Sequence, residues 1–244
     1  LSEAFAHERF YQRINSTYIF VSEILEYANK NAATIIATNK TAEDAAIKNV
    51  INNAGKTKKG VQFKMVPLQQ LNDFITYDYF QVTDAKGKKK YIRTGKVVSY
   101  DDVTYYAKFD AVKESIVPRG YVIPASFSSI IDNLIMHGIK VDTLKKSKSF
   151  SGEVFTIDSL QIEKSSFQKH STASLKGEFI AATQKFKKGD FVVDMAQPLS
   201  NLIFYLLEPQ SDDGLVTWNF FDAYLKSAGI EKKKVDYPVF KYFK

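Results

Sequence analysis

The sequence predicts an α+β fold, with helices at both ends of the chain and a mainly antiparallel, β-rich middle. Three observations support this prediction. Apolar residues recur every three or four positions over residues 1–55, as on one face of a helix. From Val61 onward the apolar period changes to two, and the last part of the chain returns to helical spacing. Because the predicted strands follow one another without a helix between each pair, the order favours antiparallel pairing over a doubly wound sheet.

The N-terminal segment is predicted to form two helices. Asn29 and Asn31, which flank Lys30, indicate a break between them. The second helix is expected to start at Thr41, which opens the sequence TAED and offers a capping hydroxyl followed by acidic residues. Asn52, Asn53 and Gly55 are expected to end this helix. One apolar stripe runs along the first helix and comprises Phe10, Ile14, Tyr18, Val21, Leu25 and Ala28.

The middle of the chain is predicted to be antiparallel sheet. The segments VQFKMV, DFITYDYFQV, YIRTGKVVSY and TYYAKFDAV either alternate in polarity or carry β-forming residues. We expect these segments to form a meander or one face of a sandwich. A helix is expected from Ser126, a candidate cap, to Gly138. Further extended segments are expected at 119–124, 138–144, 151–167 and 174–186, and a turn that leads into a short strand is expected within 186–195.

Two more helices are predicted near the C-terminus. The first has Pro198 in its first turn and ends before Pro209. The second runs from Thr217, a candidate cap, to Gly229. The change of period divides the chain into two predicted domains, residues 1–55 and residues 56–244.

Trp218, the only tryptophan, falls in the last of these helices beside two phenylalanines. Helical spacing puts Phe221, Tyr224 and Leu225 on one face, with Trp218 one turn before Phe221. We therefore expect this aromatic group to plug the core. A ligand platform is the less favoured interpretation.

The composition excludes several classes of protein. The chain contains no cysteine, so disulfides and thiolate metal sites are excluded. No apolar run approaches the ~20 residues that a membrane span needs. The net charge is +7, with lysine runs such as KGKKK at 86–90. We interpret these runs as solvated loops. A surface for polyanions is the alternative, but arginine is scarce and no nucleic-acid motif is present, so no nucleic-acid partner is expected.

The residues alone do not assemble a complete active site. His7, His137 and His170 lack partners at metal-ligand spacings, and HERFY fails the HExxH pattern because Tyr11 replaces the second histidine. Neither a nucleophile elbow nor a phosphate-binding loop is present in the sequence.

Several longer segments carry a family resemblance. The run GDFVVDMAQPLSNLIFYLLEPQSDDGLVTWNFFD, together with PRGYVIP, LIMHGIKVDTL and SFQKHSTASLKGEF, resembles the C-terminal region of a bacterial group of zinc carboxypeptidase-like proteins. The resemblance extends from about Val61 to Tyr224. In that family the catalytic domain ends with a glutamate-bearing strand and then a long helix. The opening LSEAFAHERFYQRINSTYIF looks similar, with Glu3 at the glutamate position and Arg13 and Thr17-Tyr18 on the helix.

The resemblance implies a metallocarboxypeptidase in which one zinc is held by a His-x-x-Glu pair and a distant histidine. Glu3 would be the general acid/base of the intact protein, and the zinc ligands would lie upstream of Leu1. Residues 1–55 would then be the remnant of an α/β peptidase domain, and residues 56–244 an accessory domain that supports substrate access. The implied partners are the chain's own upstream catalytic domain and a peptide substrate, and the implied location is the periplasm or the cell exterior. The chain alone is expected to be inactive.

A stand-alone binding module without catalysis is the alternative from another class. Tyr77 and Tyr79 share one face of their strand by alternation, and Tyr105 and Tyr106 lie on a neighbouring segment. Exposed tyrosines of this kind bind glycans or peptides, whereas half-buried ones would only pack against the sheet.

Overall fold

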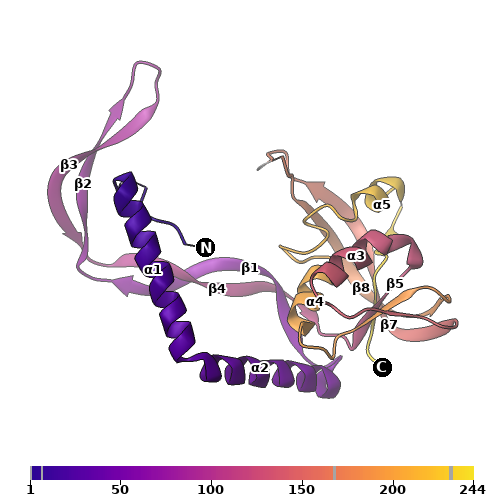
Figure 1. Cartoon of the computed structure of the whole chain (residues 1–244). Helices are drawn as coiled ribbons and strands as arrows, with labels where there is room; N and C mark the ends of the chain where they lie inside the picture. The colour runs from indigo at the N-terminus through magenta and orange to yellow at the C-terminus, as the bar shows by residue number, and fades with distance from the viewer. Residues whose placement is uncertain (1, 7, 167–168, 231–232) are drawn as a thin grey trace.

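The structure is a computed structural model that describes residues 2–6, 8–166, 169–230 and 233–244. Figure 1 shows a compact β-rich body, from which two long helices and a two-stranded ribbon extend. Helices precede the strands, and the pairing is antiparallel throughout the described ladders, so the predicted α+β class is confirmed.

Two helices form the N-terminal part, α1 (Phe10–Lys30) and α2 (Ala32–Asn53). The break at Asn31 is confirmed, and Gly55 follows the end of α2 with a positive φ of 78°. The prediction of a cap at Thr41 is wrong. Thr41 lies inside α2, where its hydroxyl donates to the carbonyl of Ala37 at 2.9 Å. The alanine-rich sequence before it is a strong helix former, so the helix continues through this position.

The first four strands form a ribbon, which corrects the expected meander or sandwich face. They are β1 (Lys58–Leu71), β2 (Phe74–Thr83), β3 (Lys89–Tyr100) and β4 (Val103–Ile116). Within the described residues, β1 pairs with β4 and β2 pairs with β3, so the four strands make one long hairpin (Figure 1). Side chains alternate with a period of two both in a ribbon and in a sheet. This period depends on the pleat of each strand, so it does not indicate which strand is the partner.

A bend divides this ribbon into two halves. Asp73 and Asp102 take left-handed φ values of 52° and 56°, which aspartate tolerates better than most residues. The Asp73 N–H donates to the Asp101 carboxylate at 3.1 Å. The Asp102 N–H donates to the side-chain oxygen of Asn72 at 3.3 Å. Each strand therefore turns at the same level of the ribbon, held by a short polar side chain from the opposite strand.

The β-rich body contains a larger sheet, which has seven strands among the described residues. β7 pairs with β8 along one edge and with β10 and β11 along different parts of the other edge, and the sheet continues from β11 through β5 and β9 to β6. The strands are β5 (Gly120–Ile123), β6 (Asp142–Thr143), β7 (Lys148–Ile162), β8 (Ala173–Phe186), β9 (Phe191–Asp194), β10 (Val235–Asp236) and β11 (Phe240–Tyr242).

Short helices complete the body: η1 (Ala125–Phe127), α3 (Ser128–Met136), α4 (Ser200–Leu207) and α5 (Asp222–Ser227). Ser126 lies inside η1 and caps nothing, which corrects that prediction. The start expected at Thr217 is also wrong, because its hydroxyl donates to the carbonyl of Ser211 at 2.8 Å and holds the chain in turns before α5. Across the described residues, no helix combines the length and apolarity needed to cross a membrane.

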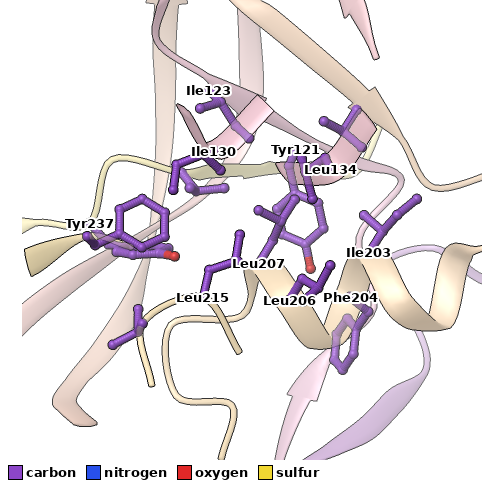
Figure 2. Packing of buried hydrophobic residues seen from close by; sticks show 14 of the residues in the cluster. Tyr121, Ile123, Ile130, Leu134, Ile203, Phe204, Leu206, Leu207, Leu215 and Tyr237 are labelled. Carbon is purple, nitrogen blue, oxygen red and sulfur yellow. The ribbon is translucent and has the colours of Figure 1, made fainter. Parts of the chain in front are cut away.

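The core lies between the sheet and these helices. Figure 2 shows Ile130 and Leu134 of α3, Tyr121 of β5, and Ile203 and Leu207 of α4 as parts of one apolar cluster. Each of these side chains is buried. Such burial of large apolar side chains is the main favourable term in folding.

The C-terminal strand closes this core. β11 lies between β7 and β5 and pairs with both. Gly152 of β7 allows this close approach, because a Cβ at that position would stand 1.9 Å from the carbonyl oxygen of Lys241. The last strand of the chain thus occupies an interior place in the sheet.

An ion pair is buried where β11 meets α4. Lys241 and Glu208 are each 1% exposed, and Lys241 Nζ lies 3.0 Å from Glu208 Oε1. Lys241 Nζ also donates to Ser115 Oγ at 2.7 Å and lies 3.8 Å from the ring centroid of Phe179. Burial lowers the pKa of Lys241, and the charge of Glu208 acts against this shift.

Two buried tyrosines lie in the field of Glu208 but differ in their hydrogen bonds. The Tyr121 hydroxyl donates to Glu208 Oε1 at 2.7 Å. The Tyr237 hydroxyl is enclosed without a hydrogen-bond partner among the described residues. Burial raises the pKa of both phenols well above the usual value, and the negative charge of Glu208 raises it further.

We predict that Gly152→Ala lowers the free energy of unfolding by about 3 kcal/mol or more, because the new methyl group would displace the backbone of β11. Ser151→Ala is the matched control: Ser151 is exposed and its hydroxyl bonds only Thr183, so its cost should stay below about 1 kcal/mol. Urea titration of both variants checks this. Equal stability of the two variants would show that β11 is not tightly packed against β7.

We predict opposite effects from the same chemical change at the two buried tyrosines. Tyr121→Phe removes a hydrogen bond to a buried carboxylate and should cost about 1.5–3 kcal/mol of stability. Tyr237→Phe removes an enclosed hydroxyl that lacks a partner, so stability should be unchanged or rise by about 1 kcal/mol.

These tyrosines also set a pH dependence. The pKa of Tyr237 is higher in the folded protein than in the unfolded chain. The stability that its protonated hydroxyl contributes is therefore fully present below the unfolded pKa of about 10 and is lost as pH rises above that value. The free energy of unfolding, measured at several pH values between 8 and 11, should therefore fall more steeply with pH for the wild type than for Tyr237→Phe. Parallel curves would contradict this assignment.

Candidate functional site

Three of the four residues that the resemblance singled out near the N-terminus line one hollow, whereas the fourth, Tyr18, is exposed on α1 and is not among the lining residues. Its volume is about 520 Å³, and its walls come from the segment before α1 and from the first turns of that helix. Glu3, Arg13 and Thr17 all belong to it. The remaining lining residues are Ser2, Ala4, Phe5, Glu8, Ser16 and Phe20. Arg13 and Thr17, which follow Glu3 by ten and fourteen positions, thus lie on the same surface as Glu3.

Glu3 lies in an extended segment that is not part of a strand, and its side chain is exposed. The predicted last strand of a peptidase domain is therefore not formed over residues 2–6. A strand needs a neighbour to pair with, and the described part of the chain offers none to this segment. Glu3 is therefore accessible to solvent.

Arg13 is the cation of this hollow. Its side chain is half-buried on α1, and its Nε is enclosed without a hydrogen-bond partner among the described residues. An enclosed guanidinium donor without a partner is costly, and a carboxylate matches its geometry. Among its described lining residues, the hollow combines two acidic side chains, Glu3 and Glu8, with the guanidinium of Arg13 and the hydroxyls of Ser16 and Thr17.

The residues present do not fit a zinc ion. Within the described ranges, no group of three or more histidine, aspartate or glutamate side chains is placed to hold a metal. His137 follows the end of α3 and is exposed. His170 stacks on Trp218, and its Nε2 is enclosed without a described partner. His7 lies outside the described residues.

The aromatic group around Trp218 is only partly the predicted core plug. Phe221 is 1% exposed, as expected, but Trp218 and Phe220 are 52% and 43% exposed. Asn219 has a left-handed φ of 65°, so Trp218 is not one helical turn from Phe221. Trp218 instead lies on the surface, where its ring centroid is 4.5 Å from that of His170 and its indole N–H donates to the Asp213 carboxylate. No pattern of apolar residues could have indicated this change of backbone direction.

The ribbon tyrosines of the alternative hypothesis are exposed. Arg93 lies 4.5 Å from the ring centroid of Tyr77 and is paired with Tyr79, which puts these three side chains on one face. Tyr105 and Tyr106 are adjacent on β4, so they point to opposite faces. The four tyrosines therefore do not form a single platform.

Comparison with known proteins gives a partial similarity. The chain is 27% identical over 112 residues to carboxypeptidase 2 of Trichophyton rubrum, which covers 44% of this chain and 21% of that protein. It is 25% identical over 124 residues to carboxypeptidase 2 of Trichophyton tonsurans, covering 51% and 22%. It is 26% identical over 104 residues to a probable carboxypeptidase 2 of Arthroderma benhamiae, covering 43% and 20%. No family model matches the chain, and no solved structure matches it.

These relatives support a carboxypeptidase-like relationship for this chain. The matched part spans about a fifth of the length of each of these relatives. They are fungal proteins, so the expected bacterial group stays a prediction.

Proposed function

We propose that this chain is the C-terminal part of a carboxypeptidase-related peptide hydrolase. In this proposal residues 1–55 complete the catalytic domain, and residues 56–244 form an accessory domain that supports it and shapes substrate access. The observation that carries the proposal is the shared hollow of Glu3, Arg13 and Thr17. The partial similarity to carboxypeptidase 2 proteins supports the same class of reaction.

The surface of α1 supports a catalytic domain as its partner. The helix buries none of its residues within the described chain. Large apolar side chains are exposed along its apolar face, including Phe10, Tyr11, Ile14, Tyr18, Ile24 and Leu25. An apolar helix face that its own chain leaves uncovered is typical of a surface that packs against another body. A domain that precedes Leu1 and packs on this face of α1 would cover it.

Glu3 is the proposed general acid/base. A carboxylate in this role takes a proton from the attacking water and returns it to the leaving amine of the peptide. Arg13 would orient an anionic group through its guanidinium, since this side chain lines the hollow. The zinc that the resemblance implies would have its ligands upstream of Leu1, so the chain alone would be inactive. Export to the periplasm or the cell exterior is part of the same proposal.

The test uses the natural protein extended N-terminally of Leu1. We predict that Glu3→Gln lowers kcat for release of C-terminal amino acids from peptides by about 10²–10⁴-fold, because it removes the proton acceptor but keeps the shape. KM should change little. Glu8→Gln is the matched control, since Glu8 lines the same hollow and carries the same charge.

The thermal unfolding of all three proteins should be the same, because both glutamates are exposed. Equal loss of activity in both variants would point to the charge of the hollow and not to Glu3. Full activity of Glu3→Gln would exclude Glu3 as the acid/base, and an inactive wild type would exclude peptide hydrolysis.

A further inference from the structure

The end of the ribbon has an unusual combination of charge and apolarity. We define the ribbon tip as residues 79–93, which comprise the end of β2, the loop and the start of β3. The tip carries five basic residues and one acidic residue. The basic residues are Lys86, Lys88, Lys89, Lys90 and Arg93.

The single acidic residue of the tip, Asp84, accepts hydrogen bonds from backbone groups of its own loop. The Asp84 carboxylate accepts hydrogen bonds from the backbone N–H groups of Lys86 and Lys88 at 3.0 and 2.9 Å. It also lies 3.5 Å from Lys90 Nζ. Gly87 takes the positive φ of 78° that the turn needs. The loop is therefore ordered by Asp84, while the ammonium groups of Lys86, Lys88 and Lys89 form no ion pair within the described residues.

Apolar side chains lie among these cations on both faces of the tip. Phe80 and Ile92 are paired across one face, and both are exposed. Tyr79 and Tyr91 lie on the other face, where Tyr91 is 69% exposed. A two-stranded ribbon has no interior, so neither face is buried by its own chain. The exposed apolar surface is thus a property of the tip itself.

The tip also protrudes. Figure 1 shows the loop between β2 and β3 at the far end of the bent ribbon, away from the β-rich body. Only a protruding element can reach a flat surface without the rest of the molecule touching it first. This position separates the tip lysines from Lys145, Lys146 and Lys188, which lie beside the ends of β7 and β8 on the body.

We propose that the ribbon tip binds the surface of anionic lipid membranes. Lysine ammonium groups are attracted to anionic headgroups, while lysine stems and tyrosine rings enter the interfacial region. Phe80 and Ile92 supply apolar side chains that can reach the acyl chains. A polyanion such as nucleic acid would explain the lysines, but it leaves the exposed apolar pair without a partner. The membrane surface accounts for both.

The first experiment measures co-sedimentation of the chain with vesicles of phosphatidylcholine alone or with one-third phosphatidylglycerol, at low salt. We expect binding only to the anionic vesicles. The variant Lys86→Gln/Lys88→Gln/Lys89→Gln should bind them at least about tenfold more weakly. The matched control Lys145→Gln/Lys146→Gln/Lys188→Gln removes the same charge from exposed positions on the body and should bind like the wild type.

A second variant tests the apolar contribution at constant charge. Tyr91→Ser/Ile92→Ser should also weaken binding to anionic vesicles, by about tenfold. Its retention on heparin should equal that of the wild type, since heparin offers charge without an apolar layer. The variants change exposed side chains, and circular dichroism confirms that each is folded.

A tryptophan probe measures how deeply the ribbon tip enters the membrane. In Tyr91→Trp, lipids brominated on their acyl chains should quench the new indole on anionic vesicles, while Trp218 of the wild type on the body stays unquenched. The proposal is overturned if the wild type does not bind anionic vesicles, if the body control loses as much binding as the tip variant, or if Tyr91→Ser/Ile92→Ser binds normally. In the last case the tip is a surface for polyanions.

Discussion

The buried ion pair between Lys241 and Glu208 ties together parts of the chain that are far apart in sequence. Lys241 lies on the last strand, Glu208 directly follows α4, and the partners Tyr121 and Ser115 come from β5 and β4. Burying two charges costs several kcal/mol, and only good geometry with further hydrogen bonds repays it. Here each charge has at least one neutral donor or acceptor in addition to its ion partner. The β-rich body therefore reaches its final packing only when the C-terminal strand is in place, and any displacement of β11 leaves a charge buried without its partner.

The N-terminal part contrasts with this body. The end of α2 contributes Val50 to the core and contacts α4, whereas α1 buries none of its residues in the described chain. The hollow of Glu3 and Arg13 is built on the helix that has the least internal support. Both facts have one explanation under the proposed function, in which α1 packs inside a catalytic domain. The ribbon is also exposed, but its tip differs from α1 because it is strongly basic, which favours an anionic lipid surface over a protein interior.

The sequence predicts the parts of this structure that depend on local physics. The α+β class, the break at Asn31 and the end of α2 at Gly55 follow from periodicity and helix-ending residues, and the structure confirms them. The pairing of β1 with β4 could not be predicted, because alternation does not identify the partner strand. The exposure of Trp218 depends on the left-handed backbone at Asn219, which the apolar pattern does not reveal. Lys241 stands between Phe240 and Tyr242 in a chain with many exposed lysines, so its burial was also missed. Glu3, Arg13, Thr17 and Tyr18 were selected by resemblance, and the structure places the first three in one hollow, while their roles stay a prediction.

The most direct test of this account is hydrogen exchange followed by mass spectrometry, on the 244-residue chain and on the natural protein extended N-terminally of Leu1. The account predicts that amides of β5, β7 and β11 exchange slowly and at the same rates in both proteins, because the body closes on itself. It predicts that amides of α1 exchange rapidly in the 244-residue chain and become at least a hundredfold slower in the longer protein, where a catalytic domain surrounds the helix. Equally rapid exchange of α1 in both proteins would contradict the account, because the helix would then have no domain to pack into.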